Sequence, residues 1–205
     1  MPETLQTLVA EVRACRACAE HLPLGPNPVL SVARSARILI LSQAPGTRVH
    51  ETSLNFNDRS GDRLREWMGV DRETFYGNNR IAVMGMGFCY PGRDAKGGDL
   101  PPRPECAPLW HPRLLAALPN VELTLLVGSY AIDYYLPAAR KISMTETVKA
   151  WRKAPKGILP LPHPSWRTTA WERKNPWFGA EALPELRVRV AALVSLPRSA
   201  PCPRR

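Results

Sequence analysis

The sequence lacks any long apolar run, which argues against a helical membrane protein. No uninterrupted apolar stretch approaches the roughly 18 residues that a membrane span needs. The first residues, Met1 to Glu11, include acidic side chains and no basic cluster, so they do not resemble a secretory signal. We therefore expect a cytoplasmic protein without membrane attachment, and a monomer. Its 205 residues, 44% of them apolar, suffice for one domain with a buried core.

Acidic residues are also scarce, since 18 Asp and Glu stand against 28 Lys and Arg. Between positions 140 and 174, nine Lys and Arg face two Glu, and the chain there also carries Trp151, Trp166 and Trp171, with Trp177 close behind. A basic surface attracts polyanions, and indole rings can stack on unpaired bases. The alternative is a solvated basic face that only aids solubility. The pattern favours a nucleic-acid partner.

Short apolar runs alternate with helical patterns along the chain. The runs at 38–41, 81–84, 123–127 and 158–161 are typical of buried strands. Helical spacing is found at 5–12, 104–118, 129–136 and 186–196. This alternation predicts one α/β domain, a three-layer α/β/α sandwich over residues 1–196, followed by a flexible tail at 197–205.

Finer signals predict how some elements begin and end. Residues 47–59 are polar and irregular, so we expect a loop there. Ser60 could cap a helix that Gly69 ends, and Ser143-x-x-Glu146 has the form of a capping box.

Two Pro-containing turns follow two of the predicted strands directly. They are Ser42-Gln43-Ala44-Pro45-Gly46 and His163-Pro164-Ser165-Trp166. In parallel sheets, ligands bind beyond the carboxyl ends of the strands, so both turns could face one pocket. A histidine opposite a turn with free backbone N–H groups suits a developing anion.

Cysteine is rare, yet four of the five cysteines stand near turns. Cys15 and Cys18 form a C-x-x-C pair, and Cys89 and Cys106 follow the second predicted strand, whereas Cys202 stands alone in the tail. Disulfides are uncommon in the cytoplasm, so four thiolates indicate a metal centre. The alternative is four small buried side chains. The residues alone do not distinguish zinc from a 4Fe–4S cluster.

Together these motifs resemble the uracil-DNA glycosylase superfamily, most closely its iron–sulfur branch, from Cys15 to about Arg167. The turn at 42–46 matches the branch's Gly-Glu-Gly/Ala-Pro-Gly motif, and residues 52–56 match loosely a Thr-Gly-Arg-Pro-Phe segment. Residues 163–166 match its His-Pro-Ser-aromatic motif. The resemblance implies a four-stranded parallel sheet and a structural 4Fe–4S cluster, with zinc the alternative, on Cys15, Cys18, Cys89 and Cys106.

The resemblance also implies roles for residues near both turns. Phe56 would stack on an extruded base beside Ala44, Pro45, Gly46 and Gly85, although packing under a loop is the alternative. His163 would donate a hydrogen bond to the base oxygen, assisted by backbone N–H groups. Ser165 would reach a phosphate, while Trp166 and Arg167 fill the gap left in the helix. The alternative for Trp166 is a place in the core.

Two residues depart from the branch. Gln43 replaces the glutamate that positions the attacking water, and glutamine is a poor base. Asp58 is therefore the first candidate carboxylate and Glu51 the second, with a solvated loop charge the alternative for both. Gly85 replaces an asparagine that reads the edge of uracil. Selectivity would then rest on backbone groups, and hypoxanthine, xanthine and 5-substituted uracils become candidate substrates.

The sequence thus predicts a monofunctional DNA glycosylase that hydrolyses the N-glycosidic bond of uracil, or another deaminated base, in DNA and so initiates base excision repair. One alternative is a catalytically weakened iron–sulfur protein that binds damaged DNA, which Gln43 and Gly85 support. Another is a thiol redox protein using Cys15 and Cys18, although a cluster would occupy both thiols.

Overall fold

A four-stranded parallel sheet forms the centre of the computed structural model, which describes residues 3–95 and 97–195. The strands are β1 (Ile38–Ser42), β2 (Ile81–Gly85), β3 (Leu123–Val127) and β4 (Ile158–Leu161), in the order β2-β1-β3-β4. Most of their residues are apolar and buried, as expected for strands covered on both faces. Ile38 of β1 is level with both Ile81 and Leu123, so the carboxyl ends of these strands meet at one edge.

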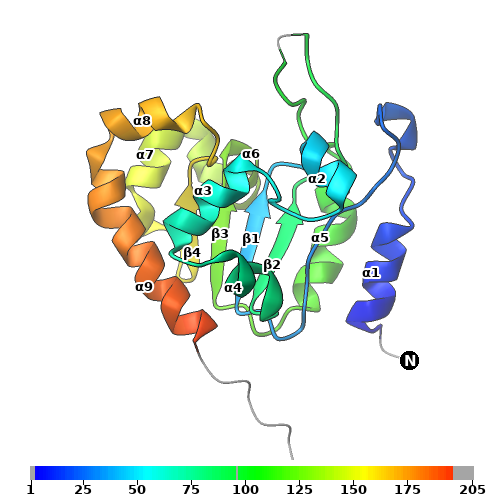
Figure 1. Ribbon diagram of the computed structural model, residues 1–205, viewed down its shortest axis with the longest axis horizontal. Helices are drawn as coiled ribbons and strands as arrows, with labels where there is room; N and C mark the ends of the chain where they lie inside the picture. Colours follow the sequence, from blue (N-terminus) through cyan, green and yellow to red (C-terminus); the bar gives the residue numbers. More distant parts are fainter. Residues whose placement is uncertain (1–2, 96, 196–205) are drawn as a thin grey trace, which may run out of the picture.

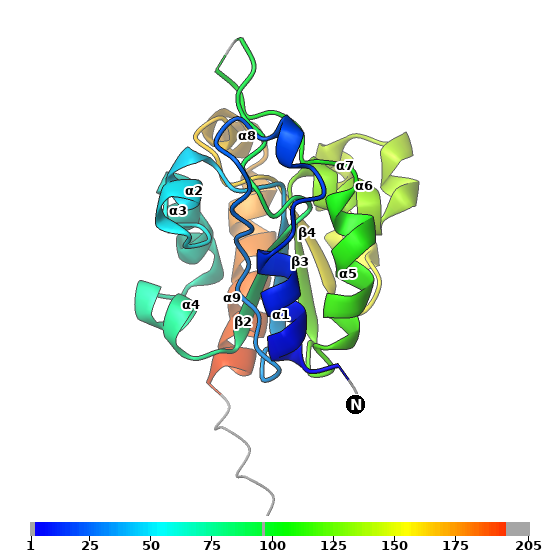
Figure 2. The same ribbon diagram turned by 90° about the vertical axis from the view of Figure 1, so that its right-hand side faces the viewer.

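Helices cover both faces of this sheet, which confirms the predicted three-layer arrangement (Figures 1 and 2). One face carries α2 (Thr47–Thr52), α3 (Arg59–Met68), α4 (Arg72–Gly77) and α9 (Leu183–Val194), the last packed against α3. The other carries α5 (Cys106–Ala116), α6 (Ser129–Tyr135) and α7 (Met144–Lys149). Helix α1 (Leu5–Arg13) packs against α5, and α8 (Thr168–Lys174) follows β4.

Several elements begin and end where the sequence signals predict. The Ser143–Glu146 capping box starts α7, and Gly69 ends α3 in the left-handed conformation (φ 68°). Short 3₁₀ turns occupy Ala19–His21, Pro137–Lys141 and Trp151–Lys153, and a π-helical turn at Phe178–Ala182 leads into α9.

Other local predictions were wrong. Helix α2 occupies half of the predicted loop at 47–59, and Asp58 rather than Ser60 caps α3 by accepting the Gly61 N–H at 2.8 Å. Aspartate is among the strongest N-cap residues, so the cap falls two positions earlier. The short helices α4 and α8 were not predicted, and the last helix spans 183–194 rather than 186–196. The predicted tail and Cys202 lie outside the described residues.

The connection between β2 and α5 projects above the carboxyl edge of the sheet (Figures 1 and 2). Within it, Arg93 and Asp99 form an antiparallel bridge. On the same side of the sheet, Ser31 bridges to Val83 and covers the outer edge of β2. None of the helices in the described parts of the chain combines the length and apolar character that a membrane span requires.

Candidate active site

A polar pocket lies at the carboxyl edge of the sheet, with about 520 Å³ of empty space that is partly open to solvent. We call it the strand-end pocket. It collects residues that follow β1, β2 and β4: Ser42, Ala44, Pro45, Gly46, Val49, Asn55, Phe56, Asp58, Ser60, Gly85, Asp99 and His163. Both turns singled out in the sequence therefore contribute to one pocket.

His163 is part-buried on the β4 side of this pocket, where the backbone fixes its position. Its carbonyl accepts hydrogen bonds from the Ser165 N–H (2.8 Å) and the Thr168 hydroxyl. Gly128, which follows β3, has φ 87°, and a Cβ there would lie 3.4 Å from the His163 Cβ, so His163 lies in contact distance of the end of β3. Burial lowers the pKa of His163, and the negative charges of Asp58 and Asp99 oppose this shift. The imidazole is therefore neutral at pH 7.

The turn after β1 presents its backbone to the pocket from the opposite side. The N–H groups of Met86 and Gly87 donate to the carbonyls of Ser42 and Gln43, at 2.7 and 3.0 Å, and hold the turn against the end of β2. Within the described part of the chain, the N–H groups of Ala44 and Gly46 have no hydrogen-bond acceptor. They remain available to an anionic ligand.

The Gln43 side chain does not line this pocket. Its amide donates instead to the Leu100 carbonyl at 3.4 Å, a long hydrogen bond to the segment that projects above the sheet. The structure therefore does not place Gln43 where it would orient a water inside the pocket.

Phe56 lines the pocket from a tightly folded loop. Its backbone has φ 55°, and Gly61 approaches so closely that a Cβ there would lie 1.7 Å from the Phe56 carbonyl oxygen. Arg65 donates to that carbonyl at 3.2 Å. The ring is 8% exposed and meets Phe75 edge-on, at 6.3 Å between centroids. Phe56 thus packs under the loop and also lines the pocket, so the two interpretations of this residue are compatible.

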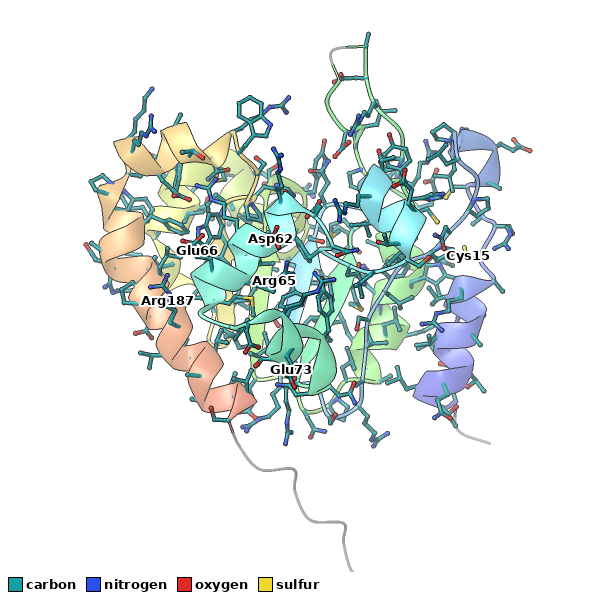
Figure 3. The ribbon with its side chains drawn as sticks, viewed as in Figure 1. Cys15, Asp62, Arg65, Glu66, Glu73 and Arg187 are labelled. Carbon is teal, nitrogen blue, oxygen red and sulfur yellow. The ribbon has the colours of Figure 1, made fainter. Side chains whose placement is uncertain are left out.

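The base of this loop is held by Arg65 of α3, labelled with Asp62 in Figure 3. The Arg65 guanidinium is nearly buried, pairs with Asp62 at 2.6 Å and bonds the Tyr76 hydroxyl. The Tyr76 hydroxyl in turn donates to the Asn55 carbonyl at 2.8 Å. The strained positive φ at Phe56 is therefore maintained by polar contacts that centre on the buried Arg65.

Two carboxylates line the pocket. Asp58 uses Oδ1 to cap α3, which leaves its other oxygen free of that bond. Asp99 comes from the projecting segment, and its Oδ2 would lie 3.9 Å from a Cβ on Gly46. Asp99 also pairs with Arg93 at 3.5 Å. Glu51 is exposed on α2 and does not line the pocket.

The sequence analysis did not predict Asp99 or the buried Asn55 as pocket residues. The signal for Asp99 was the connection itself, because some twenty residues separate β2 from α5. Loops of that length are uncommon in compact domains and often functional. Asn55 gave no signal beyond its place beside Phe56.

Gly85 lines the pocket at the end of β2, where the backbone leaves no room for a side chain. A Cβ there would lie 2.3 Å from the Gly87 carbonyl oxygen and 3.4 Å from the Ala44 Cα. The Gly85 carbonyl accepts a hydrogen bond from Nε2 of the buried His111 at 3.0 Å. This wall of the pocket therefore consists of backbone.

The segment after His163 carries an exposed aromatic ring. Trp166 is 78% exposed, and the Arg167 guanidinium lies 5.5 Å from its ring centre. This exposure excludes the core as the place of Trp166. Arg63 fixes the segment to α3 by donating to the Ser165 carbonyl at 2.9 Å and pairing with Glu172 at 2.8 Å.

The sequence predicts that the other tryptophans of the basic region alternate with charged side chains on the surface. In the structure they do not. Trp151 is buried beneath the guanidinium groups of Arg152 and Arg189. Trp171 and Trp177 meet edge-on, 5.7 Å apart, and pack against the core. These three rings therefore pack with the apolar core and do not present a stacking face among the surface charges.

All four cysteines line a second hollow, which we call the cysteine cavity. It encloses about 360 Å³ of empty space, and its other lining residues include Leu22, Phe88 and Trp110. Cys15 lies beyond α1, away from α3 (Figure 3). Burial raises the pKa of the Cys89 thiol to about 11 and that of Cys106 to about 12. The Phe88 N–H donates to the Cys106 sulfur at 3.3 Å.

The donor set of this cavity, four cysteine thiols among apolar side chains, is one that both a zinc ion and a 4Fe–4S cluster accept. A single zinc ion draws its thiolates to within about 2.3 Å of one point. Among residues 3–95 and 97–195, no group of three or more His, Cys, Asp or Glu side chains is placed to hold a metal ion. A 4Fe–4S cluster takes one thiolate on each of its four irons, inside an apolar shell.

Comparison with protein-family models matches residues 31–187 to the family described as "Uracil DNA glycosylase superfamily". The matched range contains every residue of the strand-end pocket, as well as Cys89 and Cys106, and begins after Cys15 and Cys18. It covers most of the chain, and the sheet and its helices have the α/β architecture expected for such an enzyme. Membership supports a glycosylase-type hydrolase that acts on DNA and serves DNA repair. The chain belongs to the uracil-DNA glycosylase superfamily.

Proposed function

We propose that this protein is a monofunctional DNA glycosylase that hydrolyses the N-glycosidic bond of uracil, or of another deaminated base, in DNA. The observation that carries the proposal is the strand-end pocket, where the neutral imidazole of His163 and the backbone turn at 44–46 share one hollow with two carboxylates. We place it in the cytoplasm, acting as a monomer at the first step of base excision repair.

The substrate base must leave the helix to reach this pocket, because the bond to be cleaved is inaccessible inside a duplex. In the proposed complex, Phe56 contacts the face of the extruded base. The backbone of Gly85 meets an edge that a side chain would otherwise read. Selectivity then depends on backbone groups and pocket shape, which extends the candidate substrates to hypoxanthine, xanthine and 5-substituted uracils.

Bond cleavage leaves the electron pair of the glycosidic bond on the base and positive charge on the sugar. His163, being neutral, donates its N–H to the base oxygen on which negative charge develops, and the N–H groups of Ala44 and Gly46 assist. A neutral donor stabilises this anion without transferring a proton to the base.

Water then attacks the anomeric carbon, and its proton passes to a carboxylate. Asp58 is the proposed acceptor because its second oxygen is free of the helix cap. Asp99 adds a second negative charge beside the cationic sugar. The Gln43 amide is turned toward Leu100, which argues against its participation in this step.

DNA would be held by the segment after His163. Trp166, with its exposed ring, fills the gap left by the extruded base, Arg167 supports it, and Ser165 contacts a flanking phosphate. The surplus of Lys and Arg in the chain strengthens binding to the DNA backbone.

Cys15, Cys18, Cys89 and Cys106 would hold a 4Fe–4S cluster, with zinc the alternative. Such a group supplies a cross-link between α1, the segment after β2 and the start of α5. The high pKa values of Cys89 and Cys106 mean that binding must displace thiol protons.

The test is an alkali-cleavage assay on uracil-containing oligonucleotides, single- and double-stranded, with hypoxanthine and xanthine substrates beside them. We expect a product that breaks only after alkali, as a monofunctional enzyme leaves an intact abasic site. No abasic product on any substrate would defeat the proposal. Tight binding to uracil-DNA without turnover would favour the second candidate, a weakened iron–sulfur protein that recognises damaged DNA, which the position of Gln43 supports.

A further inference from the structure

A wide groove lies on the α5 and α6 side of the sheet, outside the strand-end pocket. It holds about 1060 Å³ of empty space, much of it open to solvent, and we call it the tyrosine groove. Its aromatic walls are Tyr130 and Tyr134, one turn apart on α6, which are 38% and 39% exposed. Large rings with this exposure on adjacent turns form a surface that can be stacked upon.

The groove adjoins the strand-end pocket through two segments of chain. Gly85 lines the pocket and Met86 lines the groove. Asp99 lines the pocket and Pro101 lines the groove. Two residues of extended chain span at most about 7 Å, so the two hollows are neighbours. The proximity of the two hollows permits adjacent nucleotides of one strand to reach both.

The charges around the groove suit the backbone of such a strand. Arg103 and Arg140 line it, and Arg140 is exposed, with its Nε donating to the Asp133 carbonyl at 2.9 Å. Arg103 pairs with Glu105 at 2.7 Å through one terminal nitrogen. The Asp133 carboxylate is the one acidic group among the described lining residues. Because Glu105 neutralises Arg103, Arg140 is the guanidinium of the groove that can contact a phosphate of the strand.

We propose that the tyrosine groove binds an unpaired nucleobase next to the extruded base on the same strand, stacked against Tyr130 and Tyr134. This proposal rests on the proposed function, because it assumes that the strand-end pocket takes a base from DNA. Base stacking on aromatic side chains is tolerant of sequence and needs the neighbouring base to be unpaired. The groove therefore favours single-stranded over double-stranded substrate.

The edge-on contact of Tyr134 with Tyr135, at 5.0 Å between centroids, supports the platform. Pro101, Pro102 and Pro104 also line the groove, and their rings fix φ in this segment of the chain. Two exposed aromatic rings in an open groove suit a flat, stacking ligand such as a nucleobase.

Binding is tested with single-stranded oligothymidine, which carries no damaged base and needs no turnover. The double substitution Tyr130→Ala with Tyr134→Ala should weaken binding about tenfold or more. Tyr130→Phe with Tyr134→Phe keeps both rings and should bind within about twofold of the natural protein. Val188→Ala removes an exposed apolar side chain from α9, outside the groove, and serves as the control.

Position is tested by photo-cross-linking with 8-azidoadenine placed beside a non-cleavable 2′-fluoro analogue of deoxyuridine. The cross-linked peptide should contain residues 130–134 in single-stranded DNA, and the yield should fall in a duplex, where the neighbour is paired. Cross-links confined to the segment around Trp166, or equal affinity for the double alanine variant, would overturn the proposal. The proposal would also be overturned if the natural protein were a dimer and the double alanine variant a monomer, because the groove would then be a self-association surface.

The outcomes separate this proposal from the proposed function. If the protein forms the cross-link and its alanine variant loses affinity, but no base is released, the groove proposal is supported and the proposed glycosylase function is contradicted. If the natural protein is an active glycosylase and its alanine variant binds and cleaves DNA equally well, the proposed function is supported and the groove proposal is contradicted.

Discussion

The strand-end pocket and the cysteine cavity differ in the groups that line them. The pocket presents His163, two carboxylates and unpaired backbone N–H groups, which keep their capacity for charge and hydrogen bonds. The cavity presents four thiols among apolar side chains such as Phe88 and Trp110. A reacting bond needs polar groups aimed at it, whereas a structural centre needs water excluded. Substitutions in the pocket should therefore impair chemistry, and substitutions in the cavity should impair the fold.

The largest effect should follow from Cys89→Ala. A buried structural metal centre contributes on the order of 10 kcal/mol to folding, so the variant should lose visible absorbance, bound iron and most of its solubility. Absorbance spectra, iron content and thermal unfolding measure these losses. Cys202→Ala removes the fifth cysteine and should change none of them. A soluble, brown and fully active Cys89 variant would contradict the assignment of the cavity.

His163→Ala should have the next largest effect, and this effect should be on the reaction rate in the strand-end pocket. Loss of one donor to a developing anion lowers rates by about 100- to 1,000-fold. Because the side chain is part-buried at the pocket edge, the melting temperature and the Kd for uracil-DNA should change little. Single-turnover rates and a binding titration separate the two, with the exposed His21 as control through His21→Ala. Affinity lost in parallel with rate would assign His163 to binding rather than chemistry.

The layered fold could be predicted from the sequence because its signals are local and strong. Continuous apolar runs gave all four strands to within one or two residues, as expected where strands are buried on both faces. Short helices were the failures. Helices α2 and α4 span six residues each, too short for a periodic apolar stripe, and their stability comes from packing rather than pattern.

The site could be predicted only where a motif ends a strand. His163, the turn at 44–46 and Gly85 follow strands directly, so the sheet itself brings them together. Asp99 reaches the same pocket from a projecting connection, and local sequence does not determine where such a segment folds. The Gln43 side chain turns away for the same reason, since its partner Leu100 belongs to that connection.

Asp58→Asn should slow the reaction about 100-fold. This is at the lower end of the range expected for His163→Ala. Asparagine caps helices as well as aspartate, so the substitution removes the charge and keeps α3 intact. Asp58→Ala should lose about 1 kcal/mol of stability in addition. Rates and urea denaturation curves distinguish the two variants.

The exposed carboxylate of Glu51 provides the matched control, and Glu51→Gln should be silent. Asp99→Asn tests the second pocket carboxylate beside it. If Asp58→Asn is as fast as the natural protein while Asp99→Asn is slow, the water-activating group is on the projecting segment and not at the helix cap.

The smallest expected effect is on the pH dependence of the free energy of unfolding. The two groups to compare are the imidazole of His163 in the pocket and that of His111 in the core. His111 is buried between the Gly85 carbonyl and the Tyr135 hydroxyl, and burial lowers its pKa from 6.5. Below pH 6.5 the unfolded chain therefore binds a proton that the folded protein does not, so the free energy of unfolding falls as the pH is lowered. The loss amounts to about 1.4 kcal/mol for each unit by which the folded pKa lies below the unfolded one.

His163 has a lowered pKa as well, but the charges of Asp58 and Asp99 oppose the effect of burial. The core histidine has no carboxylate that opposes burial in this way. Denaturant titrations between pH 7.5 and 5 should show a flatter pH dependence for His111→Gln and for His163→Gln than for the natural protein. The exposed His21→Gln should leave the slope unchanged. Equal slopes in all four proteins would mean that neither imidazole is held neutral by burial, and the neutral donor proposed for the pocket would lose its physical basis.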